Sequence, residues 1–237
     1  MTKLRIRGSA LPGPLPPAVH SNIRHSAGLF LTSAEELDWR EPVSLADIRP
    51  TQMAVGMRAV EVKRQKIERH TESARKLRRF LEKRPVPAVL GPGEDYYIID
   101  HHHLSLALWQ SEVHEVFVRV VGDLSDMPKR HFLQAMTALG WLHAYDGEGR
   151  KTCPTRLPAT LDQLQPDRYR DLAWSVREAG GFKKMPIPFS EFTWANFFRG
   201  RIPSGLLSRD FERAHRQAMS LARSRDAMHL PGSLVQC

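Results

Sequence analysis

The longest regular pattern of apolar positions lies in the second quarter of the chain. Five apolar residues recur there along one stripe at helical spacing: Val60, Ile67, Ala74, Leu77 and Leu81. The stripe predicts a helix over about residues 56–84. A break is expected near His70, where Thr71 can serve as the N-cap of a second helix.

Short apolar runs flank this helix and predict strands. They cover residues 43–48, 86–90, 96–100 and 116–121. The turn Gly91-Pro92-Gly93 joins the second run to the third, so we expect these two strands to pair. A helix should start near Leu104, and another behind Pro128 with Ser125 or Asp126 as its cap. Strands that alternate with helices predict an α/β (α+β) fold.

Helical patterns without strands fill the C-terminal part of the chain. Helices are expected over residues 166–179, from the N-cap Ser190 onward, and over residues 206–224. The proline-rich lead-in should be loosely ordered, with a short helix after Thr32 or Ser33, and the tail after Met228 should fray. The predicted divisions are residues 1–40, 41–125, 126–228 (a helical C-terminal extension) and 229–237.

Aromatic residues gather in the helix that is expected after Ser190. They are Phe192, Trp194, Phe197 and Phe198. Such rings can stack on nucleic-acid bases. More commonly a cluster of this kind forms the core between helices.

Charge narrows the choice of partners. The chain has 35 Lys and Arg against 26 Asp and Glu, a net charge of +9. This excess favours nucleotides or nucleic acid as partners, although it also serves solubility alone. No run of about 18 apolar residues occurs, so a membrane partner is not expected. Cys153 and Cys237 are interpreted as thiols, which suits a cytoplasmic location.

The polar side of the helix predicted over residues 56–84 is basic. Its candidate nucleic-acid-binding residues are Lys63, Arg64, Arg75, Arg78 and Arg79. Two interpretations stay open: a solvated helix face, or a surface that follows the phosphates of a nucleic acid. No convincing helix-turn-helix segment for reading DNA bases is found in the sequence.

The stretch Asp100-His101-His102-His103 stands where a predicted strand gives way to a predicted helix. Free N–H groups and the helix dipole make such a start a ready phosphate site. Histidines can donate to phosphate or move a proton near neutral pH. Three interpretations are open: an anion or nucleotide pocket, a metal site, and a purely structural cap. Adjacent histidines fan out by about 100° around a helix, which disfavours convergence on one metal ion, so no metal ligand is assigned.

Three boxes of sequence follow one another in a fixed order. The first runs Leu45-x-x-Ile-Arg-Pro-Thr-Gln-x-x-Val-Gly56, and the second runs Tyr97-Ile-Ile-Asp-His-His-His-x-x-x-Ala-Leu108. The third joins the stretches 169–182 and 189–195. Together they resemble the ParB-like nuclease family of the ParB/sulfiredoxin-like superfamily, over about residues 43–200. The resemblance implies a small mixed-sheet domain with a helical extension, and a nuclease or nucleotide-dependent phosphotransferase activity.

The superfamily is similar in holding nucleotide phosphates at the second box. An ADP-dependent free-serine kinase of the superfamily has Asp-Gly-His-His-Arg there. This chain has His101 for the glycine and Leu104 for the arginine, so close backbone approach and a bidentate phosphate clamp are lost. Arg49 is the candidate replacement for the clamp. The kinase's catalytic carboxylate falls in the stretch that contains Gln52, which cannot act as a base, and Glu61 is the nearest carboxylate.

Candidate roles follow from the resemblance and from the residue types. The reactive cysteine of sulfiredoxin falls on His102, so sulfiredoxin chemistry is not expected. The catalytic candidates are Asp100, His102, His103 and Glu61, with His102 as the proton-transfer or phosphate-binding group and Asp100 as its orienter. The phosphate-binding candidates are Arg49, Gln52 and His101. Candidate ligands are ADP, ATP, CTP or nucleic acid, with a divalent metal left open. The alternative function is a non-catalytic, DNA-associated protein of the partition type.

Overall fold

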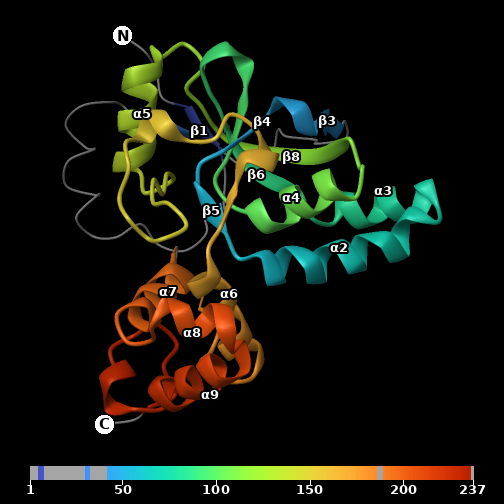
Figure 1. The fold of residues 1–237 in the computed structure, drawn as a ribbon. Helices are drawn as coiled ribbons and strands as arrows, with labels where there is room; N and C mark the ends of the chain where they lie inside the picture. The colour runs from blue at the N-terminus through green and yellow to red at the C-terminus, as the bar shows by residue number, and fades with distance from the viewer. Residues whose placement is uncertain (1–4, 8–29, 33–41, 186–188, 236–237) are drawn as a thin grey trace.

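The structure of the chain is a computed structural model, which describes residues 5–7, 30–32, 42–185 and 189–235. Two lobes are visible in Figure 1. The sheet lobe (residues 42–166) is drawn above, and the helical lobe (residues 167–235) below. The short helix predicted after Thr32 or Ser33 lies outside the described residues.

The sheet has the strand order β2-β1-β8-β6-β7-β4, and β3 pairs with a further stretch of β8. Its strands are β1 (Arg5–Arg7), β2 (Phe30–Thr32), β3 (Pro42–Ser44), β4 (Ile48–Pro50), β6 (Val86–Leu90), β7 (Tyr96–Ile98) and β8 (Glu115–Asp123). β4 with β7 and β6 with β8 are parallel pairs, whereas β6 with β7 and β3 with β8 are antiparallel. The mixed α/β fold predicted from the sequence is confirmed.

Helices cover both faces of this sheet. They are α2 (Met57–Thr71), α3 (Ala74–Glu82), α4 (His102–Gln110) and α5 (Lys129–Ala138). The first three bury residues such as Ile67 against Ile98 on one face. On the other face α5 buries Phe132 against Val89. The boundary predicted after residue 125 therefore falls inside the cluster that α5 forms with the sheet.

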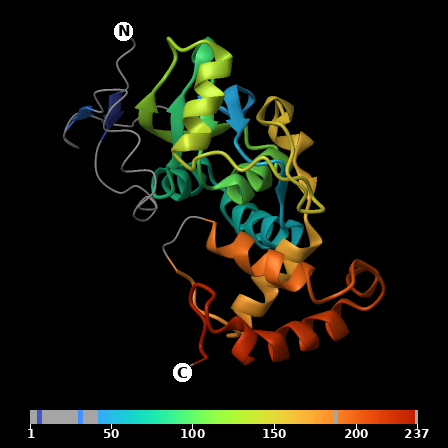
Figure 2. The ribbon, with the colours of Figure 1, turned by 90° about the vertical axis from the view of Figure 1, so that its left-hand side faces the viewer.

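The helical lobe has a core of its own. Its helices are α6 (Arg168–Glu178), α7 (Ser190–Arg199), α8 (Ser204–Arg209) and α9 (Phe211–Ala222). Trp194 and Phe198 are fully buried there. A two-stranded parallel ladder of β5 (Ala54–Val55) and β9 (Gln165–Pro166) ties the start of α2 to the start of α6. Figure 2 shows α2 directly above the orange helices of the helical lobe.

Short 3₁₀ helices complete the described elements. They are η2 (Leu45–Asp47), η3 (Pro92–Glu94), η4 (Pro154–Arg156), η5 (Leu161–Gln163) and η6 (Arg225–Ala227). The prediction of one continuous strand over residues 43–48 is wrong, because η2 separates β3 from β4. Ser44 explains the interruption, since its Oγ accepts the N–H of Ala46 at 3.1 Å and starts the 3₁₀ turn.

Several predicted helix ends need correction. The break near His70 is confirmed, but Ser73 rather than Thr71 caps α3, and its side chain accepts from the N–H of Lys76. Neither Ser125 nor Asp126 caps α5, whose N-cap is Pro128. The N-cap of α7 is Phe189, and Ser190 is the first helical residue.

The C-terminal helix and tail also differ from expectation. The helix predicted over residues 206–224 is divided into α8 and α9, because the side chain of Asp210 caps a new helix through the N–H of Arg213 at 2.9 Å. α4 starts at His102, ahead of the predicted Leu104. The described part of the tail is packed, since Trp194 Nε1 donates to the Pro231 carbonyl at 2.8 Å. None of the helices in the described ranges has the length and apolar character to cross a bilayer.

Candidate functional site

The Asp-His-His-His stretch forms the turn from β7 into α4. His101 is the N-cap of α4 and has a left-handed backbone with φ 65° and ψ 20°. Asp100 Oδ1 accepts the N–H of His101 at 2.6 Å. For a residue other than glycine this conformation costs roughly 1–2 kcal/mol. The turn therefore adopts the conformation for which glycine, present here in the serine kinase, is suited.

His102 is sealed inside the sheet lobe, with 2% of its surface exposed. Its Nε2 accepts the N–H of Thr51 at 3.1 Å, while Thr51 Oγ1 donates to the Ile98 carbonyl at 2.7 Å. Because Nε2 is an acceptor, the neutral ring carries its proton on Nδ1. That Nδ1 has no hydrogen-bond partner among the described residues. Burial lowers the pKa of His102 well below its usual range, so the ring stays neutral.

His103, the next residue of α4, also accepts a backbone N–H through its ring. Its Nε2 accepts the N–H of Gly56 at 3.2 Å. Burial, followed by the charge of Arg170, lowers the pKa of His103 well below the usual range. The two inner histidines thus hold the backbone segment that links β4 to α2. Gly56 leaves little room there, because an added Cβ would lie 3.0 Å from Asp171 Oδ1 and would require a small shift.

Cations from two lobes gather around this turn. Burial lowers the pKa of Lys63 on α2, and Lys66, Lys184 and Arg177 lower it further, whereas Asp100 raises it. Among the described residues, neither Lys63 nor Lys184 has an ion-pair or hydrogen-bond partner for its ammonium group. We refer to Lys63, Arg177 and Lys184 as the α4 cation cluster, of which Arg177 is already paired with Glu178 and Glu191. It adds positive potential beside the N–H groups of the first turn of α4.

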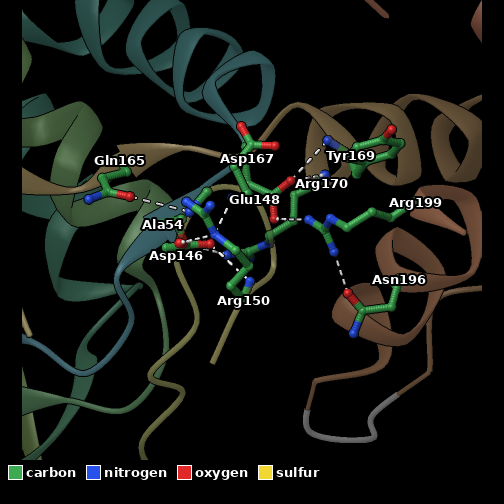
Figure 3. A network of polar contacts seen from close by, with 12 residues as sticks. Ala54, Asp146, Glu148, Arg150, Gln165, Asp167, Tyr169, Arg170, Asn196 and Arg199 are labelled. Atoms are coloured by element: carbon green, nitrogen blue, oxygen red, sulfur yellow. Dashed lines mark hydrogen bonds and ion pairs between the residues drawn. The ribbon is translucent and has the colours of Figure 1, made fainter. Parts of the chain in front are cut away.

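The inner side of the site is held by a buried arginine of α6. Arg170 donates through Nη1 to Gln52 Oε1 at 3.0 Å and to the Ala54 carbonyl at 2.8 Å. Its guanidinium lies 3.9 Å from the centre of the Phe192 ring. Figure 3 shows Arg170 beside Asp167, whose carboxylate binds Arg199 at 2.8 Å. Burial lowers the pKa of Arg170 to about 10, so it remains charged at neutral pH.

A side chain of the helical lobe, Asp171, caps the start of α2 in the sheet lobe. Asp171 Oδ1 accepts the N–H of Arg58 at 2.6 Å, in the first turn of α2. Burial raises the pKa of Asp171 to about 6, and the Arg58 N–H opposes this shift. The helical lobe is therefore attached through charged groups that each have a specific partner.

Residues 41–200 match the family model described as "Putative ParB-like nuclease". The chain belongs to the ParB-like nuclease family. Its fold is similar to the crystal structure of protein Atu1540 from Agrobacterium tumefaciens, with 38% sequence identity and a TM-score of 0.75. That match covers 83% of this chain and 98% of the other. The comparison with curated proteins found no match.

The first box meets the second through Thr51, which contacts His102, and the neighbouring Gln52 binds Arg170, whereas Arg49 lies elsewhere. Arg49 pairs with Asp95 at 2.8 Å, ahead of β7, whereas Asp100 follows the far end of β7. Glu61 binds Arg64 and Gln65. On α2, Glu61 and Lys63 point about 200° apart, so Glu61 faces away from the cluster.

The remaining basic candidates lie along α2 and α3. Arg64 is paired with Glu61 and Glu68, and Arg78 with Glu82. Arg75 and Arg79 are exposed on α3. Of the predicted set, Lys63 alone contributes to the charge environment of His101 and His103.

Sequence reasoning missed Lys184, Arg170 and Arg177. These residues come from the family's third box or directly after it, and only the docking of the two lobes brings them to α4. Of the aromatic residues considered for stacking, Trp194, Phe197 and Phe198 are buried core, whereas Phe192 is partly exposed.

Two further features bear on ligands. Within the described residues, no group of three or more His, Cys, Asp or Glu side chains is placed to hold a metal ion. A half-open pocket of about 200 Å³ lies at the far end of α4 from the histidines. It is lined by Met57, Leu106, Trp109, Gln110, Asp162, Leu164 and Pro166.

Proposed function

We propose that this chain binds the phosphate groups of a nucleotide or nucleic acid at the start of α4, within the ParB-like nuclease family. The observation that carries the proposal is the environment of the Lys63 ammonium group. This ammonium is partly withdrawn from water, has three cations and the single carboxylate of Asp100 as charged neighbours, and lacks a hydrogen-bond or ion-pair partner among the described residues. Such an arrangement is unfavourable in isolation and is relieved by a bound anion.

The donors at this site fit a phosphate group. The first N–H groups of α4 have no side-chain cap, and a helix start attracts anions. Lys63 and Lys184 supply two ammonium groups from different lobes. They take over the function for which Arg49 was expected, since Arg49 is bound to Asp95.

We assign roles to the four residues of the Asp-His-His-His stretch according to the exposure of their side chains. Asp100 is exposed at the turn and is our candidate for the carboxylate that acts on a bound phosphate ester. His102 and His103 use Nε2 to hold backbone N–H groups, so we propose that they position the segment that carries Gln52. Burial lowers the pKa of His101, Asp100 opposes this shift, and Lys63 adds to it.

Binding is tested by fluorescence anisotropy with a labelled single-stranded oligonucleotide at low salt. Lys63→Met and Lys184→Met should each weaken binding about fivefold and reduce the slope of log affinity against log salt by about 0.7. Lys76→Met, which removes an exposed charge on α3, is the matched control and should stay within about twofold. Equal affinity of all four proteins would refute the proposal.

Hydrolysis is tested separately on the same oligonucleotide with and without Mg²⁺. Strand cleavage that Asp100→Asn abolishes, while binding is retained, would support a nuclease. Binding without cleavage under either condition would favour the non-catalytic, DNA-associated alternative.

A further inference from the structure

A stack of aromatic rings lies next to the candidate phosphate site. His143 is at its centre, 4.4 Å from the ring centre of Tyr145 and 5.0 Å from that of Phe189, with an interplanar angle of 25° in both pairs. Phe192 approaches the same imidazole at 3.9 Å with a tilt of 51°. Three nearly parallel rings of this kind form a small platform.

The two end rings of the stack, Tyr145 and Phe189, both belong to partly exposed residues. Tyr145 and Phe189 make no ring contact with each other, although both stack on His143, so they flank it from opposite faces. All four rings are partly exposed, unlike Trp194 and its buried neighbours in the helical lobe. A partly exposed aromatic ring can offer a planar ligand a surface on which to stack.

The stack is electrically neutral at physiological pH. Burial lowers the pKa of His143 to about 4, and the charges of Arg170 and Arg199 lower it further. A neutral imidazole between two rings leaves the platform apolar. The phosphate-binding charge therefore lies beside the stack rather than within it.

Direct contacts join this stack to the histidine box. The N–H of His143 donates to the Thr51 carbonyl at 2.8 Å, and the N–H of Thr51 donates to His102 Nε2 at 3.1 Å. Arg170 lies on the Phe192 ring and lowers the pKa of His102, His103 and His143 together. The stack and the histidine box are thus joined by two consecutive hydrogen bonds through the backbone of Thr51.

The structure assigns to Tyr145, His143 and Phe189 a subsite for an unpaired nucleobase, and this inference rests on the proposed phosphate site. A base stacks on an end ring while its phosphate is bound by the α4 cation cluster. Aromatic platforms accept every base because each base has a π-face, so little sequence preference is expected. A paired base in a duplex exposes no face and is excluded, which makes single-stranded nucleic acid or a free nucleotide the ligand class.

The test compares three labelled oligonucleotides of one length: a single strand with bases, an abasic strand, and a duplex. The wild type should bind the base-bearing strand about tenfold more tightly than the abasic strand. Tyr145→Leu and Phe189→Leu keep apolar bulk but remove the ring, so each should reduce this ratio several-fold. Phe211→Leu, on a partly exposed ring of α9, is the matched control and should leave the ratio unchanged.

A second readout needs no variant. A 2-aminopurine base in the single strand should lose fluorescence on binding to the wild type, because stacking quenches it. Equal affinity for base-bearing and abasic strands, with dependence on Lys63 retained, would overturn the base subsite and leave the phosphate site standing. Failure of both strands to bind would overturn the phosphate site itself.

Discussion

Two groups of charges lie near each other in this molecule and are satisfied in opposite ways. At the junction of the lobes, Arg170 is buried against Gln52 Oε1 and the Ala54 carbonyl, and Asp171 accepts the N–H of Arg58. At the start of α4, Lys63 is also withdrawn from water, but three of its charged neighbours are the cations Lys66, Lys184 and Arg177, against the one carboxylate of Asp100.

The comparison separates charges that hold the fold from charges that we propose bind a ligand. A buried charge with good partners is costly to break, because removal of one member leaves the other without compensation. A cluster of like charges weakens the folded state instead, and a bound anion would relieve that repulsion. The difference makes opposite predictions for substitutions at the two places.

The largest effect is expected at the junction. Arg170→Met removes the donor to Gln52 and Ala54 and should lower the free energy of unfolding by about 4 kcal/mol, measured by urea denaturation. Arg216→Met, on an exposed position of α9, should change the value by less than about 0.5 kcal/mol. A loss below about 1 kcal/mol for Arg170→Met would show that its hydrogen bonds are not what fixes the lobes.

The next effect is a pH dependence from Asp171. Its folded pKa, raised to about 6 by burial, lies above the ordinary value of 3.8, so the fold favours the protonated form. The stabilising contribution is complete below about pH 4 and is lost as pH rises through about 6. Wild type should therefore lose about 2 kcal/mol of stability relative to Asp171→Asn between pH 4 and pH 7. A difference that does not change with pH would contradict the shifted pKa.

A smaller effect concerns the left-handed turn. His101→Gly and His101→Ala both remove the imidazole, but only alanine keeps a Cβ at φ 65°. The glycine variant should be more stable than the alanine variant by about 1 kcal/mol in thermal unfolding. Equal stability would mean that the turn relaxes to another conformation.

The smallest change in stability is expected where the charges are like-signed. Lys63→Met keeps the apolar stem and removes one of the mutually repelling cations, so the free energy of unfolding should change by less than about 0.5 kcal/mol. Binding of the oligonucleotide should nevertheless fall about fivefold. A large loss of stability together with the loss of binding would place Lys63 with Arg170, among the charges that hold the fold.

Local patterns in the sequence were sufficient for most of the framework. The alternation of short apolar runs with helical stripes correctly placed β6, β7, α4 and α6 within a few residues. Helix ends were less accurate, because Thr71 and Ser73 are both good caps and only the tertiary path of the chain selects one.

The site was harder to predict than the fold for a physical reason. Adjacent residues at a helix start point in different directions, and nothing in the run His101-His102-His103 reveals which rings turn inward. Nor does local sequence place Lys184 beside Lys63, since they meet only when the helical lobe docks on α2. Long-range contacts of this kind carry no local signal.

The most direct test of the account is a titration of the ¹⁵N-labelled protein with pyrophosphate, followed by NMR. We predict that the backbone amides of His102, His103 and Leu104 shift together along one saturable curve in the wild type. Lys63→Met should weaken the pyrophosphate affinity that this curve reports. Amide shifts confined to α3 or spread evenly over the basic surface, with the first turn of α4 unmoved, would contradict the account.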